Sequence, residues 1–127
     1  MSRYRHVSIA DKTAAGSVCI NGSWIAMKAV RVQYTVQPGF VEQNKSNIRK
    51  VMDAIRSNPI AGMQYASFVM ADRVTFVQIN MALDADTMDR LNDVREFQAF
   101  QAALKSSNPI SPPDAQSLEL VAAGFDL

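Results

Sequence analysis

The chain has 127 residues, of which 48% are hydrophobic and 20% are charged, and its formal net charge is +1. This length and composition predict one globular domain, and the small net charge provides no long-range attraction to nucleic acid or to an anionic membrane. The single cysteine, Cys19, excludes a disulfide within the chain. No apolar run approaches the roughly 20 residues that span a bilayer, so we expect a cytoplasmic protein.

The first 26 residues differ from the rest because they show no sustained hydrophobic period. Ser17–Ile20 and Trp24–Met27 could form a hairpin around Asn21-Gly22, which is a favoured two-residue turn. A flexible segment is the alternative, and translation could also begin naturally at Met27. We therefore divide the chain into an N-terminal extension, residues 1–26, and a single domain, residues 27–127.

A regular pattern begins after Met27. Apolar and polar residues alternate strictly from Val30 to Val36, which predicts a strand that Pro38-Gly39 ends. Apolar residues then recur at helical spacing over Phe40–Ser57, and Asn58-Pro59 ends this helix.

Two strands follow, at about Met63–Met70 and Val74–Ala82, joined by a tight connection at residues 71–73. A second helix is expected from near Met88 to Ser106. Pro112-Pro113 then interrupts the chain, and the last predicted strand is Ser117–Ala123.

The predicted order is strand, helix, strand, strand, helix, strand. This order is typical of a ferredoxin-like βαββαβ domain of the α+β class, with one four-stranded antiparallel sheet and two helices on one face. The third strand is apolar at nearly every position, namely Val74, Phe76, Val77, Ile79 and Met81. The face of the sheet that the helices leave uncovered therefore still carries apolar side chains. Burying such a face against a second copy of the chain removes apolar surface from water, so we expect a homodimer.

Polar residues in apolar surroundings are the candidates for a binding site. Asn44 falls on the apolar stripe of the first predicted helix, where its amide needs a hydrogen-bond partner. Gln78 and Asn80 share one strand face with Phe76, and they would contact either the partner subunit or a cavity. Tyr34 and Tyr65 each combine an apolar ring with a polar tip, and either serve the core or donate a proton to a ligand.

Several chemistries lack the residues they require. The only histidine, His6, has no companions for a metal site or a catalytic triad, and no phosphate-binding or dinucleotide pattern occurs. We therefore expect neither a metal nor another cofactor.

Five segments together resemble the antibiotic biosynthesis monooxygenase family, of the dimeric α+β barrel superfamily: Val30–Val36, Phe40–Ser57, Tyr65–Phe68, Phe76–Asn80 and Glu96–Gln101. The resemblance covers most of residues 28–125. It implies two sheets that face each other across a dimer, with a mainly apolar pocket in each subunit. Some relatives oxidise aromatic substrates with molecular oxygen and no cofactor, and others degrade haem.

The sequence departs from this family at two positions. Relatives commonly place a histidine where this chain has Glu96, and a carboxylate near the end of the third strand, where it has Asn80. The sole tryptophan, Trp24, lies outside the matched region, which argues against haem chemistry. The resemblance adds three aromatic residues to the candidates, so the predicted pocket residues are Tyr34, Asn44, Tyr65, Phe68, Gln78, Asn80, Phe97 and Phe100.

Two functions remain open. The first is a cofactor-independent, monooxygenase-like enzyme that binds a small apolar or aromatic molecule in a cavity with converging polar groups. The second is a non-catalytic barrel, either a stress-related protein or a ligand binder, whose interior is filled by Phe68, Phe97, Phe100 and the methionines.

Overall fold

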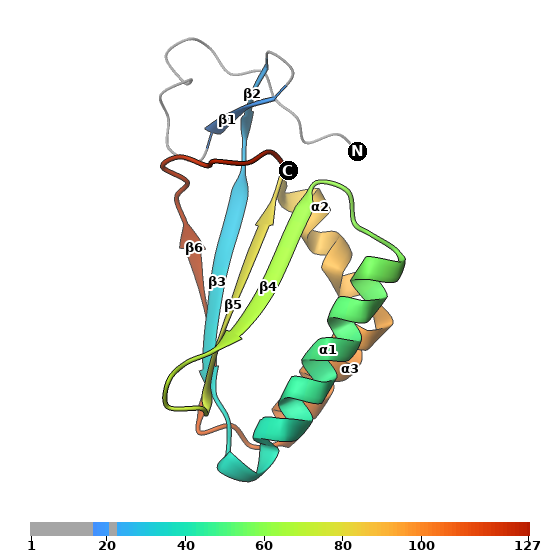
Figure 1. The fold of residues 1–127 in the computed structure, drawn as a ribbon, viewed down its shortest axis with the longest axis vertical. Coiled ribbons are helices and arrows are strands. Elements are labelled where there is room, and N and C mark those ends of the chain that lie inside the picture. Colours follow the sequence, from blue (N-terminus) through green and yellow to red (C-terminus); the bar gives the residue numbers. More distant parts are fainter. Residues whose placement is uncertain (1–16, 21–22) are drawn as a thin grey trace.

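The computed structural model describes residues 17–20 and 23–127 of the chain. Its main body is one sheet with helices on one face (Figure 1). In chain order the elements of this body are β3 (Lys28–Thr35), the 3₁₀ turn η2 (Pro38–Phe40), α1 (Val41–Ser57), β4 (Met63–Val69), β5 (Thr75–Ala82), α2 (Ala85–Asp89), the 3₁₀ turn η3 (Arg90–Asp93), α3 (Arg95–Ser106) and β6 (Ser111–Leu118).

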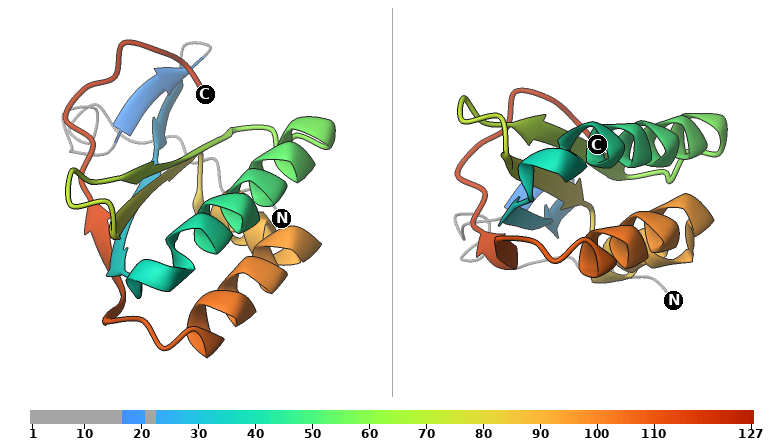
Figure 2. Two further views of the ribbon diagram at one scale, coloured as in Figure 1. Left: turned by 60° about the horizontal axis from the view of Figure 1, so that its bottom comes forward. Right: turned by 90° about the horizontal axis from the view of Figure 1, so that it is seen from below.

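The four strands form an antiparallel sheet in the order β4-β5-β3-β6. Each helical connection therefore crosses over one strand, from β3 past β5 to β4 and from β5 past β3 to β6. Helices α1 and α3 run side by side on the same side of the sheet (Figure 2). This arrangement confirms the predicted ferredoxin-like fold.

The register of the strands decides which side chains meet the helices. Tyr34 on β3 lies opposite Phe76 on β5, which in turn lies opposite Val69 on β4. Because side chains alternate along a strand, the residues in this phase face α1 and α3, and those in the other phase face away. Val77 and Ile79 belong to the outward phase and are only half-buried, so the apolar open face predicted from the sequence is present.

Helix α1 begins one residue later than predicted. Pro38 opens η2, where its missing N–H breaks no helical hydrogen bond, and α1 continues from Val41. The Asn58 N–H donates to the Ala54 carbonyl at 3.0 Å, and Pro59 then prevents a further turn.

The second predicted helix was wrong in its first half. The helical region begins at Ala85, because the Asp84 side chain caps α2 by accepting from the Thr87 N–H at 2.8 Å. The helix is then interrupted at Val94, whose extended backbone (φ −77°, ψ 119°) separates η3 from α3. This break lets Leu91 enter the core from η3 while α3 supplies its own apolar stripe.

The last predicted strand, Ser117–Ala123, was also wrong. The strand is β6 (Ser111–Leu118), so Pro112-Pro113 lies inside it instead of ending the chain's regular structure. The sheet order explains this, because β6 is an edge strand and one of its sides needs no backbone donors.

The N-terminal segment contributes a separate pair of strands, β1 (Ser17–Ile20) and β2 (Ser23–Ala26). They pair antiparallel with Cys19 opposite Trp24, so the second strand begins one residue earlier than predicted. The predicted turn residues, Asn21-Gly22, lie outside the described residues. In the part of the chain that the structure describes, no helix is both long and apolar enough to cross a membrane.

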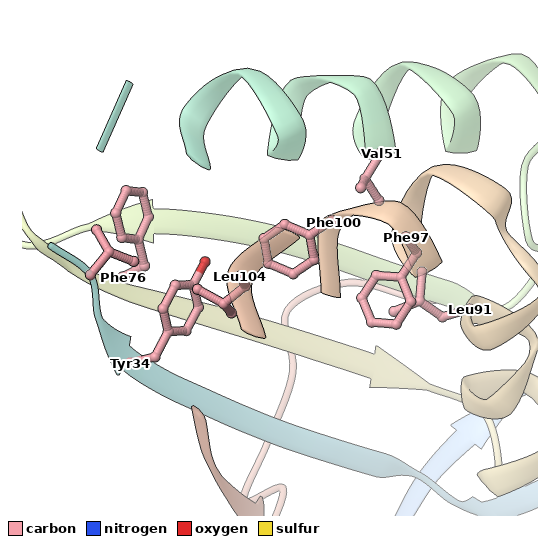
Figure 3. Close-up of a cluster of buried hydrophobic side chains, with 8 residues drawn as sticks. Tyr34, Val51, Phe76, Leu91, Phe97, Phe100 and Leu104 are labelled. Atoms are coloured by element: carbon pink, nitrogen blue, oxygen red, sulfur yellow. The ribbon is translucent and has the colours of Figure 1, made fainter. Parts of the chain in front are cut away.

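The hydrophobic core lies between the sheet and helices α1 and α3 (Figure 3). Its buried members come from β3 and the residues after it, α1, β5, η3 and α3: Tyr34, Val36, Val51, Phe76, Leu91, Phe97, Phe100 and Leu104. A folded domain of this size depends chiefly on such burial, so the polar groups found within this core require a separate explanation.

Candidate functional site

Three polar side chains meet inside this core. The Asn44 Nδ2 donates to the Tyr34 hydroxyl oxygen at 3.0 Å, and the Gln78 Nε2 lies 3.5 Å from the same oxygen. Asn44 is fully buried, at 0% exposure, and comes from the first turn of α1, while Tyr34 and Gln78 come from adjacent strands. The Tyr34 oxygen therefore receives amide protons from two elements.

Buried polar atoms remain without a partner around this cluster. Within the described residues, the Asn44 Oδ1, the Asn80 Oδ1 and the Ser67 Oγ have no hydrogen bond. Leaving such an atom unpaired costs about 1–3 kcal/mol, so proteins normally satisfy it with a neighbour, a water or a ligand. Unpaired groups on α1, β4 and β5 mark this interior as a place that can accept polar atoms from outside the chain.

Aromatic rings enclose the polar cluster. Tyr34 stacks on Phe76, with ring centres 5.5 Å apart and planes inclined by 9°. The ring centre of Phe100 lies 6.4 Å from that of Tyr34, and the two planes are tilted by 59°. Phe97 contacts Phe100 at 6.0 Å and meets Tyr65 edge-on at 6.2 Å. The rings run along the interface between the sheet and α3 (Figure 3).

Burial keeps both tyrosines protonated. It raises the pKa of Tyr34 from 10.0 to about 12, although the hydrogen bond from Asn44 acts in the opposite direction. Burial also raises the pKa of Tyr65, and the neighbouring charge on an ionised Tyr34 would raise it further. At neutral pH Tyr34 is therefore a hydrogen-bond donor, and it cannot act as a general base.

A cleft opens beside Tyr34, between α3 and strands β3 and β6, and we call it the α3 cleft. Its volume is about 590 Å³, within the range of small-molecule sites. Its lining is mostly apolar and includes Val32, Phe97, Phe100, Leu104 and Pro113. The polar groups that reach it are the side chains of Tyr34, Gln78, Gln101, Lys105 and Asn108.

A second cleft lies on the other side of the stacked rings, between α1 and β4, and we call it the α1 cleft. Its volume is about 610 Å³. Phe76 lines the α1 cleft and Tyr34 lines the α3 cleft, so the stacked pair separates the two spaces.

The structure gathers most of the predicted pocket residues on one side of the sheet. The α3 cleft is lined by Tyr34, Gln78, Phe97 and Phe100. Asn44 does not line it but donates a hydrogen bond to the Tyr34 hydroxyl. Tyr65 and Asn80 lie opposite each other on β4 and β5, in the phase that faces the helices. Of the two alternatives for Gln78 and Asn80, this phase favours a contact with the interior over a contact with a partner across the open face.

Phe68 lies apart from the other predicted residues. It occupies the outward phase of β4 and is 55% exposed, so it does not reach the α3 cleft. Conversely, Ser67 was missed, although it pairs with Gln78 across the sheet and its hydroxyl is buried. Counting in twos from Tyr65 would have placed Ser67 inside and Phe68 outside.

The described part of the chain contains no cluster of three His, Cys, Asp or Glu side chains that could hold a metal ion.

Known structures share this fold. A candidate antibiotic biosynthesis monooxygenase from Bacteroides thetaiotaomicron aligns with a TM-score of 0.68 at 7% identity, over 80% of this chain and 95% of that chain. Another from Caulobacter crescentus has a TM-score of 0.64 at 16% identity, over 76% and 91%. A protein of unknown function from Nitrosomonas europaea has a TM-score of 0.62 at 20% identity, over 80% and 96%.

No protein-family model and no curated protein matches the sequence. The solved structures therefore establish a likeness of fold, and this chain has the fold found in antibiotic biosynthesis monooxygenases. The resemblance predicted from its sequence is confirmed at that level.

Proposed function

We propose that this protein binds a small, mainly apolar molecule in the α3 cleft, and that the ligand carries an oxygen atom that accepts a hydrogen bond from Tyr34. The observation that carries the proposal is the position of the Tyr34 hydroxyl. Its oxygen accepts from Asn44 and faces Gln78, so its own proton is available for a ligand. The apolar walls favour an aromatic ring over a sugar or a nucleotide.

Donation by Asn44 and Gln78 makes the Tyr34 hydroxyl a stronger hydrogen-bond donor, because an oxygen that accepts hydrogen bonds has a more polarised O–H bond. A phenol, quinol or ketone oxygen would be bound well by such a group. If the ligand became an enolate or phenolate, the same hydroxyl would stabilise the negative charge. This is the contribution that a cofactor-independent oxygenation requires from the protein.

A binding test can use the pair naphthol and naphthalene, which differ by one hydroxyl group. Tyr34→Phe should weaken naphthol binding about five- to tenfold, the effect of one hydrogen bond of about 1 kcal/mol, and leave naphthalene unchanged. Tyr65→Phe is the matched control, because Tyr65 is a half-buried tyrosine that does not line the α3 cleft. Equal losses for both ligands, or none, would contradict the role of Tyr34.

Oxygen uptake with a panel of anthrones and quinols tests whether binding leads to chemistry. Turnover that is lost in Tyr34→Phe and kept in Tyr65→Phe would support a monooxygenase-like enzyme. If the folded protein binds these compounds but consumes no oxygen, the result would support a non-catalytic, ligand-binding function.

The non-catalytic function has an observation of its own in its favour. Among the described residues that line the α3 cleft, none is a carboxylate or a histidine, so none of them is a neutral-pH base beside the ligand. A reaction there would be limited to substrates that lose a proton readily. In addition, Phe97 and Phe100, which line the cleft, are buried and contact each other, as expected for a barrel with a packed core.

We further propose that the protein is a homodimer whose two sheets face each other. The open face supports this, because the half-buried side chains of Val77, Ile79 and Met81 lie there beside the exposed ring of Phe68. A second copy would remove this apolar surface from water.

A further inference from the structure

The α1 cleft has a different character from the α3 cleft. One wall is a long stripe of α1 that runs from Lys45 to Arg56, and the other wall is the edge strand β4. Arg56 lies eleven positions after Lys45, a rise of about 16 Å along the helix, so the cleft is an elongated groove. Its floor is apolar, with Ile48, Met52 and Ile55 on one side and Phe76 on the other.

Cations lie along the helical side of this groove. Lys45, Arg49 and Arg56 all line it, and no acidic residue does in the part of the chain that the structure describes. Lys45 contacts Glu42 at 3.4 Å, but Glu42 is largely exposed and this pair contributes little. Among the described residues, neither the Arg49 side chain nor the Arg56 side chain has an ion pair or a hydrogen bond, so their guanidinium groups are available.

Lys45 and Arg49 can act on the same group. They are four residues apart on α1, so their side chains are neighbours on one helix face, whereas Arg56 is about two turns further along. An anion held between Lys45 and Arg49 would have the apolar stripe of Met52 and Ile55 directly beside it. The hydroxyl of Ser67, which has no partner in the described structure, lies on the opposite wall.

We propose that the α1 cleft is a second ligand site, and that it takes an elongated apolar carboxylate with its charged end at Lys45 and Arg49 and its chain along Met52 and Ile55. A carboxylate matches the forked geometry of a guanidinium, and an alkyl chain matches an apolar groove. The stacked rings of Tyr34 and Phe76 separate this site from the α3 cleft, so the two can be occupied independently.

Decanoate, decanol and decyltrimethylammonium are suitable probes, because they share one chain and differ in charge. The wild-type protein should bind decanoate at least tenfold more tightly than decanol, and the cation more weakly than either. The preference for decanoate should shrink as salt is raised, since these charges are solvent-exposed. Equal binding of decanoate and decanol, or no binding of decanoate, would overturn the proposal.

The charge contacts can be tested with matched variants on one helix. Arg49→Gln should weaken decanoate binding about tenfold, the effect of losing one charge-assisted hydrogen bond, and leave decanol unchanged. Lys50→Gln removes the same charge from the adjacent exposed position, which does not line the groove, and should have little effect. A similar loss in both variants would mean that only net charge matters, which would refute a site at Arg49.

Location is tested by the amide resonances of isotopically labelled protein. Decanoate should shift amides of α1 and β4, and leave those of α3 and β6 unchanged. Shifts confined to α3 and β6 would place the carboxylate in the other cleft and overturn the proposal.

Discussion

At the scale of single residues, the contact between Tyr34 and Asn44 links stability to the binding site. Both side chains are almost completely buried, and among the described residues the hydrogen bond of 3.0 Å is the only one that the Asn44 side chain makes. The position of Asn44 on the apolar stripe of its helix predicted a buried amide. Its partner could not be predicted, because Tyr34 lies on another element and the register between them depends on how α1 packs on the sheet.

Tyr34→Phe should therefore destabilise the protein by about 1–3 kcal/mol, because it leaves the Asn44 amide buried without an acceptor. Adding Asn44→Leu should recover part of this loss, since both polar partners are then replaced by apolar groups. Urea unfolding of the two single variants and the double variant gives the coupling energy. Strictly additive losses would show that the two side chains do not interact.

Burial and the hydrogen bond from Asn44 act on the pKa of Tyr34 in opposite directions, and burial has the larger effect. The folded pKa of about 12 lies above the unfolded value of 10.0, so the folded state keeps a proton that the unfolded chain loses. The stabilisation from Tyr34 is complete below pH 10.0 and is lost as the pH rises through about 12.

Because the bond from Asn44 lowers the pKa of Tyr34, Asn44→Leu should move it further upward. Ultraviolet absorbance of tyrosinate, with Tyr34→Phe to assign the transition, measures the shift. A downward shift would mean that Asn44 accepts the Tyr34 proton, and Tyr34 would then have no proton for a ligand.

At the scale of elements, local signals predicted the existence of the strands and helices better than their ends. Val30–Val36 and the helix ending at Ser57 were placed well because proline and glycine mark their boundaries. The last strand was misplaced because two consecutive prolines, Pro112-Pro113, predict that no strand forms there unless the strand is known to lie at an edge of the sheet. That information belongs to the sheet order and is absent from any local window of sequence.

The connection between α1 and β4 depends on Gly62. Its φ of +79° is a left-handed conformation, and a Cβ there would lie 2.8 Å from the Leu83 Cδ1. Gly62→Ala should therefore destabilise the protein by about 1–2 kcal/mol from the backbone alone. Gly39→Ala is the control, because its φ is not positive and nothing lies within 4 Å of an added Cβ.

Thermal and urea unfolding should show a loss for Gly62→Ala and none for Gly39→Ala. If Gly62→Ala matched the wild type, the left-handed turn would not exist in solution.

At the scale of the whole molecule, the open face of the sheet leads to the proposed homodimer. Ile79→Glu places a charge in the middle of that face, where Ile79 lies opposite Arg31 on β3 and Ala66 on β4. If two sheets face each other, this variant should be a monomer by analytical ultracentrifugation. Lys50→Glu, on the exposed surface of α1, should keep the dimer.

A wild-type monomer at micromolar concentration would contradict the proposed assembly, and so would a dimer that Ile79→Glu leaves intact. The sequence indicated this face through the apolar third strand, but it could not show which surface of a second copy would cover it.

The two edges of the sheet are not equivalent. Strand β6 carries Pro112 and Pro113, which have no N–H to offer to another strand, whereas β4 has no proline. A chain that added to β4 through its own β4 edge would leave only β6 edges at both ends of the joined sheet. Growth by edge pairing would therefore stop at two chains, which protects this protein from the open-ended stacking that leads to fibres.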